Sequence, residues 1–221
     1  MEEARAYQNA ILCAPLPNEL DLARELGVSA GTVRKALDRL GADRIVVRRQ
    51  GRGTFVVDQA HPKEALRFER LRQGNGDPIE WRAELLQQGS GNASTVEQQW
   101  LRIGAGEPVV RTRRLWCTQK RPLMVEDTCL ATSRLPGLNP DEAGELSITA
   151  LAQGYGVLLA RASERVSAEV TSQEAARLLR IKPDTVLLRC DRIIRSTNDE
   201  PIEWRSAHCH MQGEYYLAKV A

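Results

Sequence analysis

Apolar residues near the start of the chain recur at helical spacing. Leu20, Ala23 and Leu26 stand three positions apart, and Gly27 is a natural stop for the helix they predict. Ser29 is a good N-cap for a second helix. The apolar stripe of that second helix is Val33, Ala36, Leu37 and Leu40. The short connection between the two helices indicates a helix-turn-helix, and a further amphipathic helix is expected over residues 4–13.

Two short β-rich runs follow the second predicted helix. They are IVVRR (45–49) and TFVV (54–57), and the turn between them contains glycine, which predicts a hairpin. A loop that cradles a phosphate needs a helix directly after it, because helix N–H groups hold the anion. Here a strand follows instead. The pattern therefore favours a basic wing against DNA over a nucleotide site.

The second part of the chain contains an internal repeat. Segments 101–130 and 179–209 both begin with LRI and continue through a turn, a strand with two arginines three positions apart, and a strand that starts at proline. A capping-box pattern precedes each copy, with Ser94 and Glu97 before the first and Thr171 and Glu174 before the second.

A third, partial copy at 67–86 shares the string PIEWR with the later hairpin. We therefore expect three hairpins with about six antiparallel strands. A helix is expected near 146–154 and a further strand near 160–170. The fold class is α+β, with a winged helix-turn-helix followed by a mainly antiparallel sheet domain with helices.

Composition narrows the class of protein. The chain has 221 residues, enough for one large or two small domains, and it has no apolar run long enough to span a membrane. An acidic N-terminal segment without a clear apolar stretch argues against a secretion signal. The chain has five cysteines, an odd number, and no two of them have CxxC spacing. This favours reduced thiols over a framework of disulfides. We expect a cytoplasmic protein with no membrane partner.

Charge is distributed unevenly along the chain. Residues 28–57 contain seven Lys or Arg against two Asp, whereas residues 58–221 contain 22 basic and 22 acidic residues. A basic module attached to a neutral one indicates a polyanion partner for the first module alone. The expected organisation is a DNA-binding domain over 1–57, a polar linker over 58–65 and a second domain over 66–221.

Other chemistry has weaker support. His208 and His210 share one face of a predicted strand, but no third or fourth ligand is close in sequence, so neither a metal nor another cofactor is expected. Cys209 between them is a weak candidate for a redox switch. No nucleophile, base and orienting group form a recognisable set, which argues against an enzyme. A lyase-like small-molecule enzyme and a ligand-independent DNA-binding protein remain the alternatives.

The segment LPNELDLARELGVSAGTVRKALDRLGADRIVVRRQGRGTFV (16–56) resembles the DNA-binding domain of the GntR family of bacterial transcription regulators, and its end resembles the HutC subfamily most closely. The resemblance implies that the helix from Ser29 enters the major groove and that the wing contacts the DNA backbone or minor groove. The implied DNA contacts are Ser29, Thr32, Arg34, Lys35, Arg48, Arg49, Gln50, Gly51, Arg52, Gly53 and Thr54. Leu20 and Ala30 stand where the family usually has arginine.

Residues 66–221 resemble the UTRA effector-binding domain, whose fold is like that of chorismate lyase. The resemblance implies an effector site formed by Arg114, Trp116, Glu126, Glu203 and Arg205. Trp116 replaces the second arginine of sugar-phosphate-binding members, which removes a phosphate clamp and adds a flat apolar wall. The expected ligand is a small organic acid or a sugar-derived metabolite. The implied protein is a homodimeric, ligand-responsive regulator of operator DNA, with repression as the family default.

Overall fold

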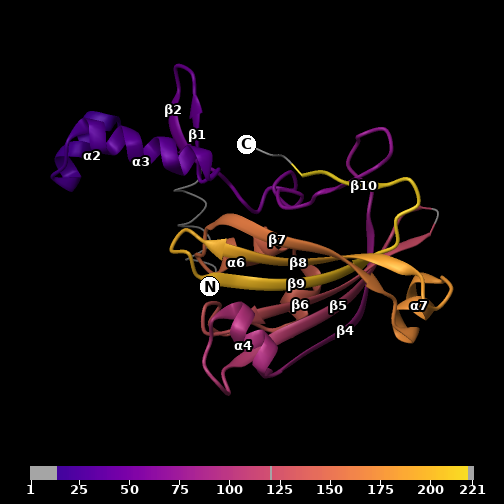
Figure 1. Cartoon of the computed structure of the whole chain (residues 1–221). Helices are drawn as coiled ribbons and strands as arrows, with labels where there is room; N and C mark the ends of the chain where they lie inside the picture. The colour runs from indigo at the N-terminus through magenta and orange to yellow at the C-terminus, as the bar shows by residue number, and fades with distance from the viewer. Residues whose placement is uncertain (1–13, 120, 219–221) are drawn as a thin grey trace.

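The computed structural model of the chain describes residues 14–119 and 121–218. A small N-terminal domain projects from one side of a larger sheet domain (Figure 1). The elements of the small domain are α2 (Glu19–Leu26), α3 (Ala30–Ala42), β1 (Val46–Arg49) and β2 (Gly53–Val56). The helix expected over residues 4–13 lies outside the described residues.

Local capping places α2 and α3 as the sequence predicts. Gly27 ends α2 in the left-handed conformation, with φ 64°. The Ser29 side chain accepts a hydrogen bond from the Thr32 amide at the start of α3. The two helices and the β1–β2 hairpin confirm the winged helix-turn-helix.

The apolar stripes were only partly right. Ala23, Val33 and Leu37 form the small core between the helices. Ala36 is exposed, and so are Leu20 and Leu26, at 61% and 66%. Leu20 and Leu26 are exposed because the rotation of α2 directs Leu22 and Ala23 toward α3 instead. Spacing alone identified the helix but not the face that it buries.

The large domain is built on one antiparallel sheet. Its helices are α4 (Thr95–Leu101), α5 (Pro140–Glu145), α6 (Ile148–Gly154) and α7 (Gln173–Leu179). Its strands are β3 (Leu71–Arg72), β4 (Arg82–Asn92), β5 (Pro108–Cys117), β6 (Pro122–Ala131), β7 (Leu159–Val170), β8 (Val186–Ser196), β9 (Pro201–Cys209) and β10 (Tyr215–Tyr216). Six strands pair in the order β4-β5-β6-β9-β8-β7, and β3 pairs separately with β10.

The internal repeat becomes a pseudo-symmetric sheet. Each copy runs strand, helix, hairpin, as β4–α4–β5–β6 and β7–α7–β8–β9, and the copies meet where β6 pairs with β9. The capping box at Ser94 and Glu97 is confirmed. The one expected at Thr171 is wrong by one residue, because Ser172 is the N-cap of α7 and accepts from the Ala175 amide.

The third hairpin is wrong in its pairing. Within residues 67–86, Arg72 and Pro78 form only an isolated bridge, and β3 pairs with β10 instead. The following residues form β4, which gains a full ladder by pairing with β5 at the sheet edge. The strand expected near 160–170 joins the sheet as β7. The helix α5 was not predicted; Asn139 caps it before Pro140, but it has only six residues.

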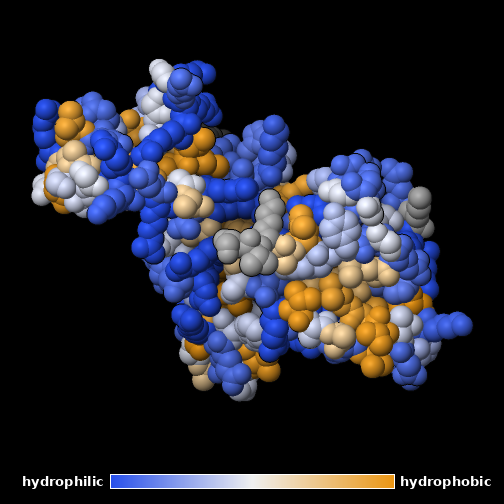
Figure 2. Space-filling view, turned by 45° about the horizontal axis from the view of Figure 1, so that its top comes forward, coloured by the Kyte–Doolittle hydropathy of each residue, from blue (hydrophilic) through white to orange (hydrophobic). Residues whose placement is uncertain are grey.

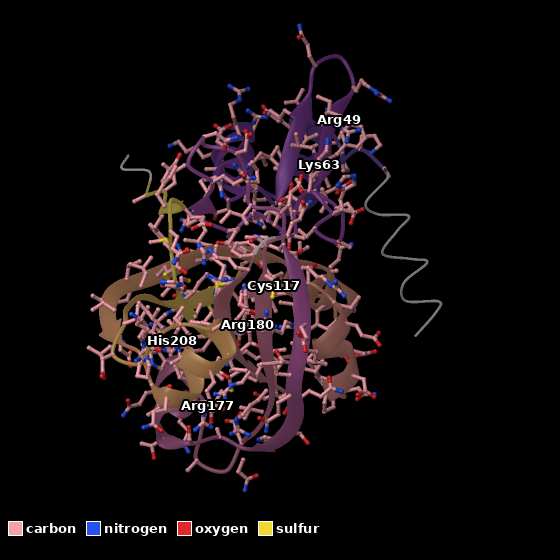
Figure 3. All side chains as sticks on the ribbon, turned by 90° about the vertical axis from the view of Figure 1, so that its right-hand side faces the viewer. Arg49, Lys63, Cys117, Arg177, Arg180 and His208 are labelled. Atoms are coloured by element: carbon pink, nitrogen blue, oxygen red, sulfur yellow. The ribbon has the colours of Figure 1, made fainter. Side chains whose placement is uncertain are left out.

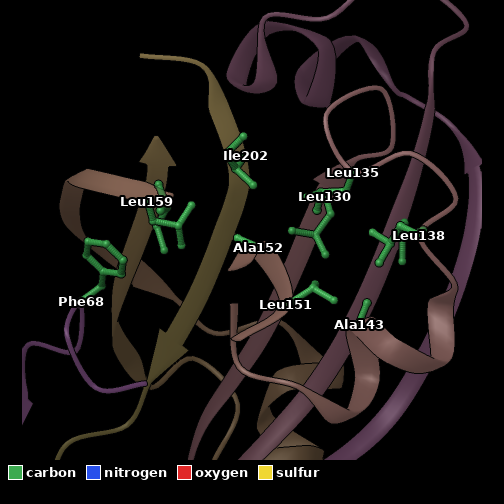
Figure 4. Close-up of a cluster of buried hydrophobic side chains, with 11 residues drawn as sticks. Phe68, Leu130, Leu135, Leu138, Ala143, Leu151, Ala152, Leu159 and Ile202 are labelled. Carbon is green, nitrogen blue, oxygen red and sulfur yellow. The ribbon is translucent and has the colours of Figure 1, made fainter. Parts of the chain in front are cut away.

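The sheet has two covered faces. On one face, Phe68, α5 and α6 pack over the main core (Figure 4). The members of this cluster are Phe68, Val110, Leu130, Leu135, Leu138, Ala143, Leu151, Ala152, Leu159, Ile194 and Ile202. On the other face, Leu101 of α4 and Leu179 of α7 cover smaller clusters. Adjacent residues Val109 and Val110 of β5 belong to opposite faces, as strand alternation requires.

The segment expected to be a polar linker is docked on the large domain. Gln59 is fully buried and exchanges two hydrogen bonds with the Leu159 backbone, at 2.8 and 2.9 Å. The side chain of Gln153 in α6 accepts from the Ala60 amide and donates to Asp58. A buried amide with both partners satisfied holds this segment in one place.

Arg67 joins the two domains. Its guanidinium donates to the carbonyl of Asp43, the C-cap residue of α3, and to the carbonyls of Leu159 and Ala160 at the start of β7. Ile45 of the small domain packs against Ala160 beside this contact. The end of the predicted recognition helix is therefore tied to the sheet domain through one side chain.

Candidate DNA-binding wing and effector pocket

The wing is a tight hairpin with a basic tip. Arg49 pairs with Gly53, so residues 50–52 form the connection. Gly51 and Gly53 have φ of 70° and 105°, backbone conformations that favour glycine. Arg49, Gln50 and Arg52 are exposed. The wing points away from the sheet domain, with Arg49 labelled near the top of Figure 3.

Two of the predicted DNA-contacting arginines form ion pairs within the small domain. Glu19 accepts from Arg34 at 2.9 Å and from Arg48 at 3.4 Å. Asp38 also pairs with Arg48, at 2.7 Å. The Arg49 guanidinium lies 4.8 Å from the centroid of the Phe55 ring. Arg34 and Arg48 are more than half exposed, but acidic neighbours partly neutralise their charge.

The remaining predicted contacts divide into capping and surface groups. The Ser29 hydroxyl caps α3 and also lies 2.9 Å from the Thr32 hydroxyl. Lys35 is exposed on α3. Thr54 is half-buried, and its carbonyl accepts from the Leu16 amide. The surface of this small domain is largely hydrophilic in the view of Figure 2, with scattered hydrophobic residues.

All five predicted effector residues line one cavity of about 210 Å³. The floor of the cavity is the sheet face that α5 and α6 cover. The segment around Glu69 and the connection between α5 and α6 form its other walls. The sequence-based set in its lining is Arg114, Trp116, Glu126, Glu203 and Arg205. The repeat in the sequence brings Arg114 and Arg192 to matching places, opposite Glu126 and Arg205 respectively.

Sequence reasoning missed several residues of this cavity, among them Glu69, Trp81, Met124 and Arg192. Arg192 belongs to the arginine pattern of the repeat, and that pattern could have identified it. Glu69 precedes the sheet in sequence and has no motif around it. Trp81 is half-buried and packs on a core cluster as well as lining the cavity.

Arg205 is the centre of a buried charge network. It is 4% exposed, and its terminal nitrogens donate to Glu69, Glu126 and Glu164 at 3.4, 3.1 and 3.0 Å. Burial opposes the charged form, but these carboxylates raise the pKa of Arg205. Burial raises the pKa of Glu203. The Arg192 guanidinium, 3.4 Å away, acts in the opposite direction and lowers that pKa in part.

Arg114 connects this network to the covering helix. It donates to the Thr112 hydroxyl at 2.9 Å and to the carbonyls of Ala143 and Gly144 in α5, and it lies 3.6 Å from Glu126. The same guanidinium therefore lines the cavity and holds the helix that closes it.

A second cavity of about 520 Å³ lies on the opposite face of the sheet, between α4 and α7. Its charged side chains are paired, Glu97 with Arg111 and Arg113 with Asp127, each at 2.6 Å. Trp204 lines it and stacks on Trp100 with ring centroids 5.8 Å apart. None of the predicted effector residues is among its lining residues.

The two histidines of the sequence pattern have separate surroundings. His208 lies 3.4 Å from Glu169, on the face of the sheet that α7 covers. Figure 3 labels His208. His210 follows the end of β9, and burial together with Arg121 lowers its pKa. Across residues 14–119 and 121–218, no three His, Cys, Asp or Glu side chains are grouped to hold a metal ion. Cys117, Cys129, Cys190 and Cys209 are free thiols.

Comparisons with known proteins place both domains in families. Residues 13–56 match the model described as "Bacterial regulatory proteins, gntR family", and residues 78–212 match the UTRA domain. No helix in the described ranges has the length and apolar character needed to cross a membrane.

Individual relatives agree with the domain matches. The chain is 27% identical over 193 residues to the HTH-type transcriptional regulator YurK of Bacillus subtilis, covering 86% of this chain and 79% of YurK. It is 28% identical over 202 residues to the HTH-type transcriptional repressor PhnF of Mycolicibacterium smegmatis, covering 86% and 78%. The crystal structure of PhnF from Mycobacterium smegmatis shares the fold, with a TM-score of 0.60, 24% identity, and coverage of 100% and 98%. The chain therefore belongs to the GntR family of transcription regulators, in the group whose winged helix-turn-helix is followed by a UTRA domain.

Proposed function

We propose that this protein is a homodimeric, cytoplasmic repressor that binds operator DNA through α3 and the wing. We further propose that a metabolite in the cavity beneath α5 and α6 changes its affinity for DNA. The domain division is the one expected from sequence, 1–57, 58–65 and 66–221. One observation carries the proposal: a basic wing with exposed arginines and a buried, charged cavity are joined by a segment that is bonded to both domains.

The DNA contacts are assigned by exposure and charge. Lys35, Arg49 and Arg52 are exposed, and no salt bridge is found for them in the described residues, so they are the strongest phosphate contacts. Arg34 and Arg48 would exchange acidic partners for phosphates on binding. Ser29 acts first by fixing the start of α3 and second by presenting its N-terminal turn to DNA.

A homodimer is supported by the geometry of operator recognition. A two-fold protein reads a pseudo-palindromic site with one recognition helix in each half-site, and a single basic module contacts too few phosphates for tight specific binding. Light scattering of the purified chain, alone and with a DNA fragment, measures the assembly directly. A monomer that binds one half-site would contradict this part of the proposal.

The effector is proposed to be a small metabolite that lies in the cavity lined by Arg114 and Glu126. A ligand that binds only the folded protein raises its melting temperature by mass action. A thermal-shift screen against sugar phosphates, amino-acid breakdown products, amines and organic acids identifies the class. If the ligand occupies this cavity, Glu126→Gln changes the shift, downward for a ligand that binds the carboxylate and upward for an anion that it repels. An unchanged shift in that variant would place the ligand elsewhere.

A further inference from the structure

The proposed effector cavity offers a ligand more carboxylate than guanidinium. The charged residues of its lining are Arg114, Arg192, Arg205, Glu69, Glu126, Glu145 and Glu203. Three positive groups thus stand beside four negative ones. A further carboxylate, that of Glu164, binds Arg205 at 3.0 Å. Burial raises the pKa of Glu203, but even with that group protonated the other three lining carboxylates and Glu164 outnumber the three guanidinium groups. The balance of charge therefore favours a ligand that brings positive charge into the cavity.

The guanidinium groups are already engaged. Each of their six terminal nitrogens donates to a protein oxygen. Arg205 binds three carboxylates, Arg192 binds the Phe68 carbonyl and Glu203, and Arg114 binds Thr112 and two carbonyls of α5. An anionic ligand would have to displace these partners before it could form the paired hydrogen bonds that arginine offers an oxyanion.

The carboxylates, in contrast, keep acceptor capacity. Oε2 of Glu203 accepts from Arg192, while Oε1 has no hydrogen-bond donor within the described part of the chain, although the residue is only 5% exposed. Oε1 of Glu126 lies 3.6 Å from Arg114, which is longer than a hydrogen bond. Both oxygens therefore keep an acceptor position that a hydrogen-bond donor of the ligand can occupy.

Three buried donors also lack acceptors, namely the Nε atoms of Arg192 and Arg205 and the indole nitrogen of Trp116. These atoms have almost no water-accessible surface. A molecule that fills the cavity therefore does not reach them without movement of the protein. These donors therefore do not change the preference for a cationic ligand, which follows from the accessible carboxylate oxygens.

The remaining wall is aromatic and apolar. Trp81 and Trp116 meet edge to face with ring centroids 5.8 Å apart, and Met124 lies opposite Trp116 on β6. Trp faces attract cations, most strongly where water is excluded. Carboxylates and indole rings lining one small cavity form a pair of features that recognises an organic ammonium group with an apolar body.

We propose that the effector is a small amine-bearing cation, with its ammonium group on Glu203 and Glu126 and its apolar body against Trp116. The inference rests on the proposed function, in which this cavity is the effector site. It decides against the organic acid and against a phosphorylated sugar, because both bring negative charge to carboxylates.

The test uses calorimetry of the full chain with matched probes at neutral pH. The probes 2-phenylethylamine, 2-phenylethanol and 3-phenylpropanoate share a ring and chain but differ in charge, and glucose 6-phosphate adds a phosphorylated sugar. We expect the amine to bind about tenfold or more tightly than the alcohol, because hydrogen bonds to charged groups are the stronger ones. The two anions are expected to bind more weakly than the alcohol. Tightest binding by either anion would overturn the proposal.

Variants locate the amine. Glu203→Gln is expected to weaken amine binding about tenfold or more while leaving the alcohol nearly unchanged. Glu200→Gln, an exposed glutamate in the same hairpin, is the control and should change neither. If Glu203→Gln does not fold, Trp116→Arg provides the second test, because an added guanidinium should repel the amine and favour the carboxylate. An amine affinity that neither substitution changes would contradict the assignment.

The outcomes separate this inference from the proposed function. If an anion binds and Glu126 or Arg114 variants change its affinity, the result supports this cavity as the effector site and contradicts the amine. Failure of every probe, in a preparation that still binds DNA, would reject the amine, while the thermal-shift comparison of wild type and Glu126→Gln still tests the cavity as the effector site.

Discussion

At the scale of single residues, the arginines of the small domain differ in what already neutralises them. Glu19 and Asp38 pair with Arg34 and Arg48, whereas Arg52 at the wing tip is exposed and forms no ion pair within the described residues. A cation that must first leave an acidic partner gains less from a phosphate than one that is exposed to water alone. The wing tip is therefore where charge contributes most directly to DNA affinity.

Arg52→Ala is expected to weaken DNA binding on all sequences and to reduce the salt slope of binding by about 1, because one phosphate contact is lost. Fluorescence anisotropy across a salt series measures both quantities. Arg177→Ala, on α7 of the sheet domain and far from the wing in Figure 3, is the matched control. An unchanged salt slope in Arg52→Ala would contradict the phosphate contact.

Glu97 makes a pH-dependent contribution to stability. Burial alone would raise its pKa, but hydrogen bonds from Arg111 and Ser94 lower it from 4.5 to about 2. A depressed carboxyl pKa stabilises the folded state fully above the unfolded pKa, and the contribution is lost as pH falls from 4.5 through 2. Because Arg111 remains 39% exposed, we expect about 2 kcal/mol rather than the full value of the shift.

Chemical denaturation of wild type and Glu97→Gln between pH 7 and pH 2 measures this contribution. The variant should be less stable near neutral pH and should lose less stability on acidification. Glu200→Gln, which is exposed, should follow the wild-type profile. Parallel pH profiles for wild type and Glu97→Gln would show that the carboxylate does not stabilise the fold.

At the scale of elements, caps and turns decide where each helix begins. The Ser29 side chain accepts from the Thr32 amide and fixes the first turn of the proposed recognition helix. The same residue is a predicted DNA contact, so its two roles need separate measurements. Ser147 and Ser172 cap α6 and α7 in the same way within the sheet domain.

Ser29→Ala is expected to cost about 1 kcal/mol of stability, and Ser29→Gly only a few tenths, because glycine is tolerated at an N-cap. Thermal unfolding of both variants measures the difference. A hydroxyl that acted only on DNA would leave both melting temperatures unchanged. If both variants fold normally at the assay temperature, an equal loss of DNA affinity in the two would then report the direct contact.

At the scale of the whole molecule, one short segment connects the proposed DNA-binding and effector sites. Arg67 binds the C-cap carbonyl of α3 and the start of β7, and Glu69, two residues later, binds Arg205 in the cavity. Gln59 anchors the same segment to Leu159. A ligand that rearranges the carboxylates around Arg205 therefore acts on a segment that holds the end of α3. It can change DNA affinity only by as much as its own affinity differs between the two arrangements.

Arg67→Ala is expected to increase amide exchange over residues 58–70 and to reduce the ligand-induced change in DNA affinity toward none, while ligand binding itself persists. Hydrogen exchange by mass spectrometry and anisotropy with and without ligand measure the two effects. Arg70→Ala, an exposed neighbour, is the control. A normal ligand response in Arg67→Ala would show that the domains communicate by another route.

Much of the fold and some of the site follow from local pattern. The helix-turn-helix, the wing, the β5–β6 and β8–β9 hairpins and the cap at Ser94 depend on residues a few positions apart, and each is where the sequence predicts it. The five predicted effector residues meet in one cavity because the repeat carried their register. The hairpin at 67–86 was wrong because similar strings can pair with different partners once an edge strand is available.

The sequence by itself determined the helix-turn-helix, the basic wing and the two repeated hairpins, since helical periodicity, capping and turn chemistry act over a few residues. The family followed from the resemblance of both domains to known regulators. Only the tertiary structure decided which charges are free and which groups are buried. Glu19 reaches Arg34 and Arg48 from 15 and 29 positions away, and Glu69 meets Arg205 from 136 positions away. Gln59, in a segment that reads as a polar linker, is buried against Leu159. Ion pairing and burial depend on which distant surfaces come together, and no local pattern records that.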